Sequence, residues 1–265
     1  MPETDLVYDV GVNDGADSAY YLFRGFRVLG IEASPVLATN LRQRFAKEIA
    51  DGRYTLLDVG VAEEAGHAEF WMSDVTEWSS FDRVLASRKG TPHKAVQIPT
   101  RTFSSIMEEF GIPLYCKVDI EGNDCCCLTG LTKNTAPRYL SIEMSYEDGN
   151  EHIDLLYDLG YRDFKIISQV MRAAAMPTIT KLYGMLPEIG RSALRFSIKN
   201  TLGVASYNGW QFRFGSSGAF GEESPGRWRS VKETKALWRT LKEIDQQFGR
   251  AGLVEWFDIH ARRRP

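Results

Sequence analysis

The residues of this sequence that could take part in chemistry lie in short acidic turns, and each turn directly follows an apolar run. The first turn follows residues 6–10 and reads Gly-Val-Asn-Asp-Gly, with Gly11 and Gly15 four positions apart around Asn13. Glycine adopts positive φ freely, and asparagine adopts it more readily than most residues. The turn can therefore fold tightly and bring backbone amides close to a ligand.

The acidic residues around this turn indicate which charge a bound ligand should have. Asp9, Asp14 and Asp17 surround the place where a dinucleotide enzyme sets a pyrophosphate on a helix N-terminus, and carboxylates there repel phosphate. S-adenosylmethionine instead presents an ammonium and a sulfonium cation, which carboxylates attract, and its own carboxylate can take amides of the turn. The turn thus favours S-adenosylmethionine over NAD. Helix-capping aspartates in an ordinary strand-to-helix turn are the alternative.

Two further strand ends carry groups suited to a nucleoside. Glu32, followed by Ala33, ends the run at residues 27–32, where a carboxylate can accept hydrogen bonds from both hydroxyls of a ribose. That role serves NAD and S-adenosylmethionine equally. Asp58, in the third run, can accept a hydrogen bond from the exocyclic amine of adenine while the Val59 amide faces a ring nitrogen. A surface turn is the alternative there.

Acids at two later strand ends are the candidates for the reaction itself. Asp119 and Glu121 stand two apart at the end of the run 114–120, so they project to one side if the strand stays extended. Glu143 lies at the end of the next run, 139–144. These carboxylates can orient a substrate hydroxyl, hold the ammonium of a ligand or bind a divalent cation. The first two uses are preferred over a metal.

Methyl transfer asks little of a protein, because a sulfonium is already a strong electrophile and in-line positioning of the nucleophile supplies much of the acceleration. A base helps, and His260 is the candidate, since residues 256–260 combine aromatic surface with an acid and an imidazole. The three consecutive cysteines at 125–127 have neither CxxC spacing nor a nearby histidine. Helix packing is therefore expected of them.

Alternating strands and helices must position these residues. Apolar runs predict strands at residues 6–10, 27–32, 54–61, 66–72, 114–120, 139–144 and 160–167. Helical spacing predicts helices at residues 17–23, 35–49, 102–110, 123–131 and 151–159. Such alternation implies a mostly parallel α/β sheet with helices on both faces and a ligand site at the carboxyl ends of the strands.

The pattern changes after residue 168. Residues 169–203 hold five basic residues against Glu188 alone, interleaved with apolar residues; the five are Arg172, Lys181, Arg191, Arg195 and Lys199. A cap that packs on the sheet edge is preferred, with a membrane-surface or anionic-substrate helix as the alternative. The expected divisions are a core at 1–168, a helical cap insert at 169–209, and a segment at 210–265 that completes the core with a last strand (210–214), a helix (231–248) and an aromatic tail.

Composition limits the function. With 265 residues, 43% of them hydrophobic, the chain can bury one substantial core and a small cap. A net charge of -3 gives no general attraction to nucleic acid or to an anionic membrane, so a small or neutral substrate is expected. The sequence shows neither a signal peptide nor the roughly 20 apolar residues that a membrane span needs. We expect a cytoplasmic protein with reduced thiols and no stable membrane insertion.

These motifs resemble those of the FkbM-type S-adenosylmethionine-dependent methyltransferases. The family's cofactor turn is matched by VYDVGVNDG, its second-strand acid by IEASP and its fourth-strand signature by KVDIEGND, and the resemblance covers most of residues 5–167. It implies a Rossmann-like class I methyltransferase sheet with a small C-terminal cap. By position, it implies cofactor contacts from Gly11, Asn13, Asp14, Gly15, Glu32 and Asp58, with Asp119 and Glu121 near the methyl-transfer centre and Ser79 and Ser80 in a loop beside it.

The resemblance further implies O-methylation of a hydroxyl on a sugar, a polyketide or another small natural product. A dinucleotide-dependent oxidoreductase is one alternative, although the GxGxxG spacing it needs is missing. A noncatalytic nucleoside-binding protein is the other. Nucleic-acid methylation would want a basic groove near the strand ends, which the sequence does not show. The acceptor and the oligomeric state are left open.

Overall fold

The computed structural model describes residues 4–145, 148–171, 173–197, 206–207, 209–212, 216–248 and 256–264. The chain divides into two compact units, Met1–Arg138 and Tyr139–Pro265, each with a sheet region and helices of its own. The division expected from the sequence, into a core at 1–168, a cap insert at 169–209 and a segment at 210–265, stays a prediction.

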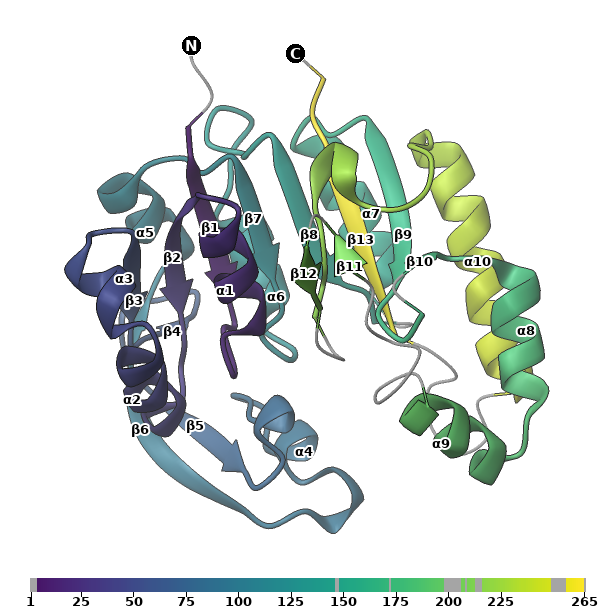
Figure 1. Ribbon diagram of the computed structural model, residues 1–265, viewed down its shortest axis with the longest axis horizontal. Coiled ribbons are helices and arrows are strands. Elements are labelled where there is room, and N and C mark those ends of the chain that lie inside the picture. Colours follow the sequence, from purple (N-terminus) through teal and green to yellow (C-terminus); the bar gives the residue numbers. More distant parts are fainter. Residues whose placement is uncertain are drawn as a thin grey trace. The chain divides into compact units, whose positions relative to one another are not determined.

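Four parallel strands form the main sheet of the first unit (Figure 1). They are β1 (Leu6–Val10), β2 (Arg27–Ile31), β3 (Tyr54–Leu57) and β7 (Tyr115–Val118), in the spatial order β7-β1-β2-β3. The register sets Asp9 of β1 beside Gly30 of β2 and Lys117 of β7. Because the strands are parallel, the turns that follow their carboxyl ends lie at one edge of the sheet.

A second sheet of three strands belongs to the same unit. β4 (Gly60–Val61) pairs in parallel with β6 (His93–Arg101), which pairs antiparallel with β5 (Gly66–Ser73). The strand predicted at 54–61 is therefore broken, since β3 and β4 lie in different sheets with Asp58 and Val59 between them. No strand is predicted from the sequence at the position of β6. Pro99 lies within this strand, and proline is unfavourable inside a strand because it lacks a backbone N–H donor.

Helices connect the strands of the first unit. They are α1 (Ala16–Phe23), α2 (Pro35–Arg44), α3 (Ala46–Ala50), α4 (Arg83–Ala86), α5 (Phe103–Phe110) and α6 (Asp124–Thr129), with 3-10 turns η1 (Thr76–Trp78) and η2 (Arg88–Gly90). α1 packs on β1 and β2 (Figure 1). The helix predicted at 35–49 is split at Phe45, whose backbone leaves the helical region and whose ring centroid lies 4.6 Å from that of Tyr54.

The second unit is built around β13 (Phe257–Arg262). This strand pairs antiparallel with β8 (Tyr139–Glu143) on one side and with β9 (Asp163–Ser168) on the other, and β10 (Ala173–Ala174) pairs with β9. Among the described residues the last strand is thus β13, a segment expected from the sequence to be a tail. Within the expected strand at 210–214, β12 (Trp210–Gln211) pairs with β11 (Ser206–Tyr207), and residues 213 and 214 lie outside the described residues.

Helices α7 (Gly149–Asp158), α8 (Pro177–Met185), α9 (Glu188–Ser197) and α10 (Val231–Phe248) complete the second unit, with the 3-10 turn η4 (Gly221–Glu223). α10 packs against α7, α8 and β9 through a face that includes the fully buried Trp238. No helix in the described parts of the chain is long and apolar enough to cross a bilayer. The elements are those of a mixed α/β protein with mostly parallel strands, which confirms the predicted fold class.

Candidate active site

The turn after β1 has the backbone that its glycines and asparagine predict. The angle φ is +82° at Gly11, +51° at Asn13 and +81° at Gly15, all in the left-handed region. A Cβ at Gly11 would lie 1.8 Å from the carbonyl oxygen of Asp119, and a Cβ at Gly15 would lie 2.7 Å from the ring of Phe45. Close approach therefore requires both glycines in addition to the unusual φ.

Glu32 ties the end of β2 to this turn. The residue is 7% exposed, and its Oε2 accepts a hydrogen bond from the amide of Asn13 at 2.9 Å while its Oε1 accepts one from the amide of Ser34 at 2.8 Å. Burial raises the pKa of the Glu32 carboxyl to about 7, although both amide hydrogen bonds act to lower it. The carboxylate is thus fixed in orientation, and each oxygen keeps a further lone pair for a ligand. Ala33, beside it, is half-buried.

A buried lysine connects the same turn to the end of β7. The Nζ atom of Lys117 lies 3.2 Å from the carbonyl oxygen of Gly11, 3.3 Å from Asp9 Oδ1, 3.5 Å from Asp119 Oδ2 and 3.6 Å from Asp17 Oδ2. Burial opposes a charge on the lysine, but the three carboxylates outweigh burial and hold the pKa of Lys117 above its ordinary value. Lys117 therefore carries a charge that fixes the turn, β1 and the residue after β7 to one another.

The two predicted aspartates that flank the turn differ in position. Asp9 is fully buried and accepts a hydrogen bond from the Ser18 hydroxyl at 2.6 Å, so any pull on a cationic ligand must act through space. Asp14 is exposed, and its Oδ1 accepts the amide of Ala16 at 2.9 Å. Asp14 thus has the turn-forming contact that the sequence analysis gives as the alternative.

Asp119 and Glu121, the two acids after β7, lie beyond the extended part of the chain and contact different partners. β7 ends at Val118 and φ is +48° at Glu121, so the extended geometry that would send Asp119 and Glu121 to one side is not present. Asp119 faces Lys117, whereas Glu121 Oε2 pairs with Arg88 Nη1 at 3.0 Å. Burial raises the pKa of Glu121 to about 7 even though Arg88 acts to lower it. Near neutral pH this carboxyl can therefore exchange a proton.

Asp124 and Ser80 hold this acid loop in shape. Asp124 Oδ1 accepts the amide of Ile120 at 3.1 Å, and its Oδ2 accepts the amide of Gly122 at 3.2 Å. The Ser80 hydroxyl donates to the carbonyl oxygen of Glu121 at 2.6 Å and is itself 1% exposed. Ser80 therefore anchors the loop, and its predicted contact with the cofactor stays a prediction.

Two buried acceptors near the turn have no hydrogen-bond partner among the described residues: Asn13 Oδ1 and Asp58 Oδ1. The other carboxylate oxygen of Asp58 pairs with Arg42 at 2.5 Å, so the side chain is held in place. Val59, next to it, is half-buried. Buried polar atoms are rarely left without a partner, and an acceptor of this kind fits an N–H donor of a ligand.

The remaining two predicted catalytic residues lie in the second unit. Glu143 ends β8 and is half-buried. His260 lies within β13 between Ser141 of β8 and Lys165 of β9, is 2% exposed, and has no hydrogen-bond partner for either ring nitrogen among the described residues. Burial, and then the charge of Lys165, lowers the pKa of His260 to about 3. The geometry gives His260 a packing position, and its use as a base stays an untested prediction.

Sequence reasoning assigns no role to Lys117, Arg88 or Asp124. A lysine between Cys116 and Val118 in an otherwise apolar strand is the one signal that could have found Lys117, because a buried lysine needs anionic partners. Nothing local marks Arg88, since its partner lies 33 positions later and reaches it only through the fold.

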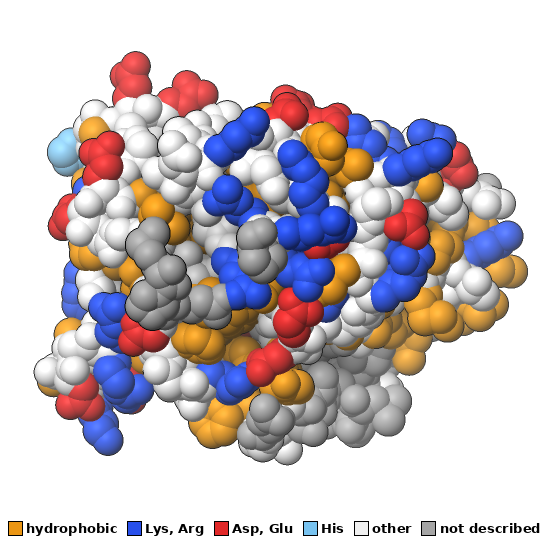
Figure 2. Space-filling view, turned by 90° about the horizontal axis from the view of Figure 1, so that it is seen from above, with side chains coloured by type: hydrophobic (Ala, Val, Ile, Leu, Met, Phe, Trp, Pro, Cys, Tyr) orange, Lys and Arg blue, Asp and Glu red, His pale blue; other side chains and the backbone are white. Residues whose placement is uncertain are grey.

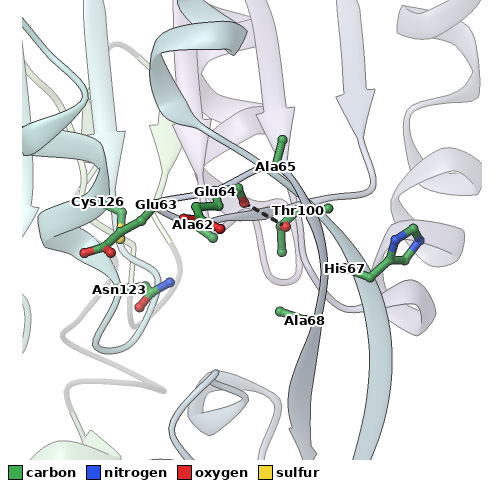
Figure 3. Close-up of a pocket in the computed structure, with 10 residues that line it drawn as sticks. Ala62, Glu63, Glu64, Ala65, His67, Ala68, Thr100, Asn123 and Cys126 are labelled. Carbon is green, nitrogen blue, oxygen red and sulfur yellow. Dashed lines mark hydrogen bonds between the residues drawn. The ribbon is translucent and has the colours of Figure 1, made fainter.

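An open pocket of about 410 Å³ lies beside the site in the first unit (Figure 3). It is lined by residues 62–65 of the turn before β5, by residues 66–68 of β5 itself, by Thr100, and by Asn123 and Cys126 at the start of α6. The Thr100 hydroxyl donates to the carbonyl oxygen of Glu64 at 3.0 Å across its floor (Figure 3). None of the residues predicted to hold the cofactor lines this pocket.

Within the described residues, no group of three or more His, Cys, Asp or Glu side chains is arranged to hold a metal ion.

These features define a class of protein. A parallel sheet has a glycine turn after its first strand and a buried carboxylate after its second, bound to the amide of that turn. That combination is typical of α/β proteins that bind a nucleoside at the carboxyl edge of the sheet.

The chain belongs to the FkbM methyltransferase family. The family model for the methyltransferase FkbM domain matches residues 9–162, which is more than half of the chain and includes every site residue of the first unit. The match confirms the resemblance seen in the sequence motifs, and it supports a methyltransferase. No curated protein matches the sequence.

Solved structures similar to the chain include two methyltransferases. The methyltransferase FkbM from Methylobacillus flagellatus KT is 20% identical, with a TM-score of 0.41 over 60% of this chain and 39% of that one. The precorrin-6y C5,15-methyltransferase from Geobacter metallireducens GS-15 is 9% identical, with a TM-score of 0.40 over 99% of this chain and 81% of that one. This chain therefore spans less than half of the first of these structures.

Proposed function

We propose that the chain binds S-adenosylmethionine and methylates a hydroxyl oxygen of a sugar, a polyketide or another small natural product. The main observation in favour of this cofactor is the hydrogen bond between the Asn13 amide and the Glu32 carboxylate. Two buried acceptors without a partner among the described residues, Asn13 Oδ1 and Asp58 Oδ1, support it further. Family membership supports the transfer of a methyl group. The class of acceptor rests on the resemblance to FkbM-type enzymes.

The charges of the site favour a cationic nucleoside over a dinucleotide. Three carboxylates, those of Asp9, Asp17 and Asp119, share the single charge of Lys117, so the edge of the sheet keeps an excess of negative charge. That excess attracts an ammonium or sulfonium group and repels a pyrophosphate. The residues present therefore fit S-adenosylmethionine.

Each part of the ligand has a partner in this proposal. The oxygens of Glu32 accept the ribose hydroxyls, while Asp58 Oδ1 and the Val59 amide meet the adenine. Amides of the turn from Gly11 to Gly15 take the carboxylate of the ligand, and Asn13 Oδ1 accepts from its ammonium. In each case a donor meets an acceptor, so neither Asn13 Oδ1 nor Asp58 Oδ1 is left without a partner.

When bound, S-adenosylmethionine supplies a methyl group that is activated by the positive sulfur. The protein has to orient the acceptor hydroxyl and receive the proton that this hydroxyl gives up on methylation. Glu121 suits the second task, because burial places its pKa near 7 and a general base works best when its pKa is close to the working pH. Asp119, fixed by Lys117, suits the orientation of the hydroxyl. Glu143 stays a candidate for either task.

We expect the affinity for S-adenosylhomocysteine to depend on pH through Glu32. The ionised carboxylate accepts the ribose hydroxyls and the protonated form loses acceptors, so affinity is lost as pH falls through the Glu32 pKa of about 7. The Kd should be constant above about pH 8, weaken by up to about tenfold for each unit as pH falls below about 7, and level off roughly 10- to 100-fold weaker once the carboxyl is protonated. In Glu32→Gln the Kd at pH 8 should be weaker by roughly 10- to 100-fold, and the pH step should be absent. Isothermal titration at several pH values measures both effects.

The control for this titration is Glu108→Gln, an identical change at an exposed position of α5. It should keep both the affinity and the pH step. NAD and NADH are titrated in separate runs. Binding of a dinucleotide in place of the thioether would return the protein to the oxidoreductase alternative, and equal affinities in wild type and Glu32→Gln would contradict the assignment of Glu32.

We expect Asp119→Asn to separate chemistry from binding. The amide keeps the shape of the side chain but loses the charge that fixes it to Lys117, so turnover should fall about 100-fold while affinity for S-adenosylhomocysteine changes little. Turnover is measured by mass spectrometry on a panel of sugars and polyketide alcohols supplied with S-adenosylmethionine. Asp74→Asn, at an exposed position, is the matched control. Normal turnover in Asp119→Asn would remove this residue from the mechanism, and binding without turnover on every acceptor would favour the noncatalytic alternative.

A further inference from the structure

Exposed apolar side chains are concentrated on two helices of the second unit. Of the thirteen large hydrophobic residues that are exposed in the described parts of the chain, seven lie between residues 176 and 196. They are Met176, Ile179, Leu182, Met185, Leu186, Ile189 and Phe196, with exposed fractions from 37% to 81%. Single exposed apolar residues are common on soluble proteins, but a cluster of this kind marks an interaction surface.

The spacing of these residues shows that both helices are amphipathic. On α8 the exposed Ile179, Leu182 and Met185 follow one another at intervals of three, whereas Thr180 and Tyr183 are buried on the opposite side. On α9, Ile189 and Phe196 are two turns apart, and Ser192 and Ala193 between them are also exposed. α8 therefore packs on its unit with one face and presents an apolar stripe outward, and α9 presents Ile189 and Phe196 outward while Arg191 is buried. Hydrophobic side chains are visible in Figure 2 at the edge where α8 and α10 lie.

The charge of this segment differs in sign from the rest of the chain. Residues 169–203 hold five basic residues and one acidic residue, an excess of four positive charges, while the whole chain has a net charge of -3. The remaining residues therefore carry a net charge of -7. Lys181 is exposed beside Leu182, whereas Arg191 is buried and pairs at 3.0 Å with the segment's one acid, Glu188. Arg172 and Lys199 lie outside the described residues and the side chain of Arg195 is not described, so these three residues enter only the charge count.

We propose that α8 and α9 form a surface that lies on an anionic lipid bilayer, with the stripe from Ile179 to Phe196 in the headgroup region. Interfacial helices combine an outward apolar face, basic residues and a length too short to span the membrane. The described helices have the apolar face, the short length and the exposed Lys181, and the sequence of the segment supplies the excess of basic residues. A second copy of this chain is a poorer occupant, because a symmetric contact would place two segments of like charge against each other. The surface uses none of the residues assigned to the cofactor, and the proposal takes up the membrane-surface alternative in place of the cap that the sequence analysis prefers.

The test is co-sedimentation of the full chain with vesicles of phosphatidylcholine alone and of phosphatidylcholine with phosphatidylglycerol. We expect binding to the mixed vesicles, weaker binding to the neutral ones by about fivefold for each basic residue that reaches the surface, and loss of binding at high salt. The double variant Leu182→Glu with Ile189→Glu should reduce binding to the mixed vesicles at least tenfold. Both side chains are exposed, so the fold should not change.

Val84→Glu is the control, because Val84 is 72% exposed but lies in the first unit. It should bind vesicles like the wild type, and circular dichroism should show that all variants are folded. Equal binding to neutral and anionic vesicles, or no binding to either, would overturn the proposal. So would a dimer in sedimentation velocity that the double variant dissociates while vesicles have no effect, since the face would then be covered by a second copy.

Discussion

Gly11→Ala is expected to abolish cofactor binding, with a loss of affinity for S-adenosylhomocysteine greater than about 100-fold. The new methyl group would lie 1.8 Å from the carbonyl oxygen of Asp119, and 2.8 Å from its carbonyl carbon. These are backbone atoms of the residue directly after β7, so no side chain can rotate to make room. Either β1 and β7 separate or the turn changes its path, and each response moves the amides that the ligand needs.

The matched control for this prediction is Gly25→Ala. Gly25 has nearly the same φ, +87°, but nothing lies within 4 Å of its Cβ position. Gly25→Ala should therefore show only the cost of the left-handed backbone, about 1 kcal/mol of stability, with unchanged affinity. Thermal unfolding and isothermal titration measure the two properties separately. If Gly11→Ala bound the thioether as well as Gly25→Ala does, the close approach of the turn to Asp119 would not matter for function.

The turn and Glu32 are predictable from sequence because their behaviour is local. Glycine and asparagine at Gly11, Asn13 and Gly15 impose the backbone angles of the turn whatever surrounds them. An acid at the end of a second parallel strand necessarily lies beside the turn of the first, since the two strands are neighbours. Both features therefore follow from order along the chain and from a topology that strand and helix alternation predicts.

Lys117 cannot be predicted in the same way. Its partner Asp9 is 108 positions away, and the contact exists only because β7 pairs with β1 rather than with another strand. The sequence shows a lysine in an apolar run but not which carboxylates surround it. The same is true of Glu121, whose direction changes because the strand ends at Val118 and not at Ile120 as expected.

β13 is a segment that the sequence analysis describes as an aromatic tail and that forms a strand in the structure. Its polar residues Asp258, His260 and Arg262 alternate with apolar ones, which is typical of a strand, while the use of His260 as a base stays an untested prediction. The strand lies between β8 and β9, which buries the ring of His260 against Lys165 of the neighbouring strand. Central position in a sheet is a property of the whole chain, and no periodicity within the segment predicts it.

Lys117→Met is expected to cost about 3–5 kcal/mol of stability, because it removes the one cation beside a fully buried carboxylate. The sign of the pH dependence follows from Asp9. Without Lys117, burial raises the pKa of Asp9 further, so the folded state holds a proton that the unfolded state releases. The loss of stability should therefore be largest at alkaline pH and shrink as pH falls through the raised pKa of Asp9. Chemical denaturation of wild type and variant at several pH values measures it.

A second variant separates stability from function. Asp9→Asn combined with Lys117→Met removes the buried charge together with its partner, so much of the stability should return. Affinity for S-adenosylhomocysteine should be lower than in wild type in both the single and the double variant, because the carbonyl oxygen of Gly11 lacks the donor that positions it. Lys165→Met, at the buried lysine of the second unit whose acceptors are two carbonyl oxygens and the Ser224 hydroxyl, should leave affinity unchanged. Full recovery of affinity in the double variant would show that Lys117 serves only to neutralise the charge of Asp9. If affinity stays below that of the wild type, Lys117 is the residue that positions the cofactor turn.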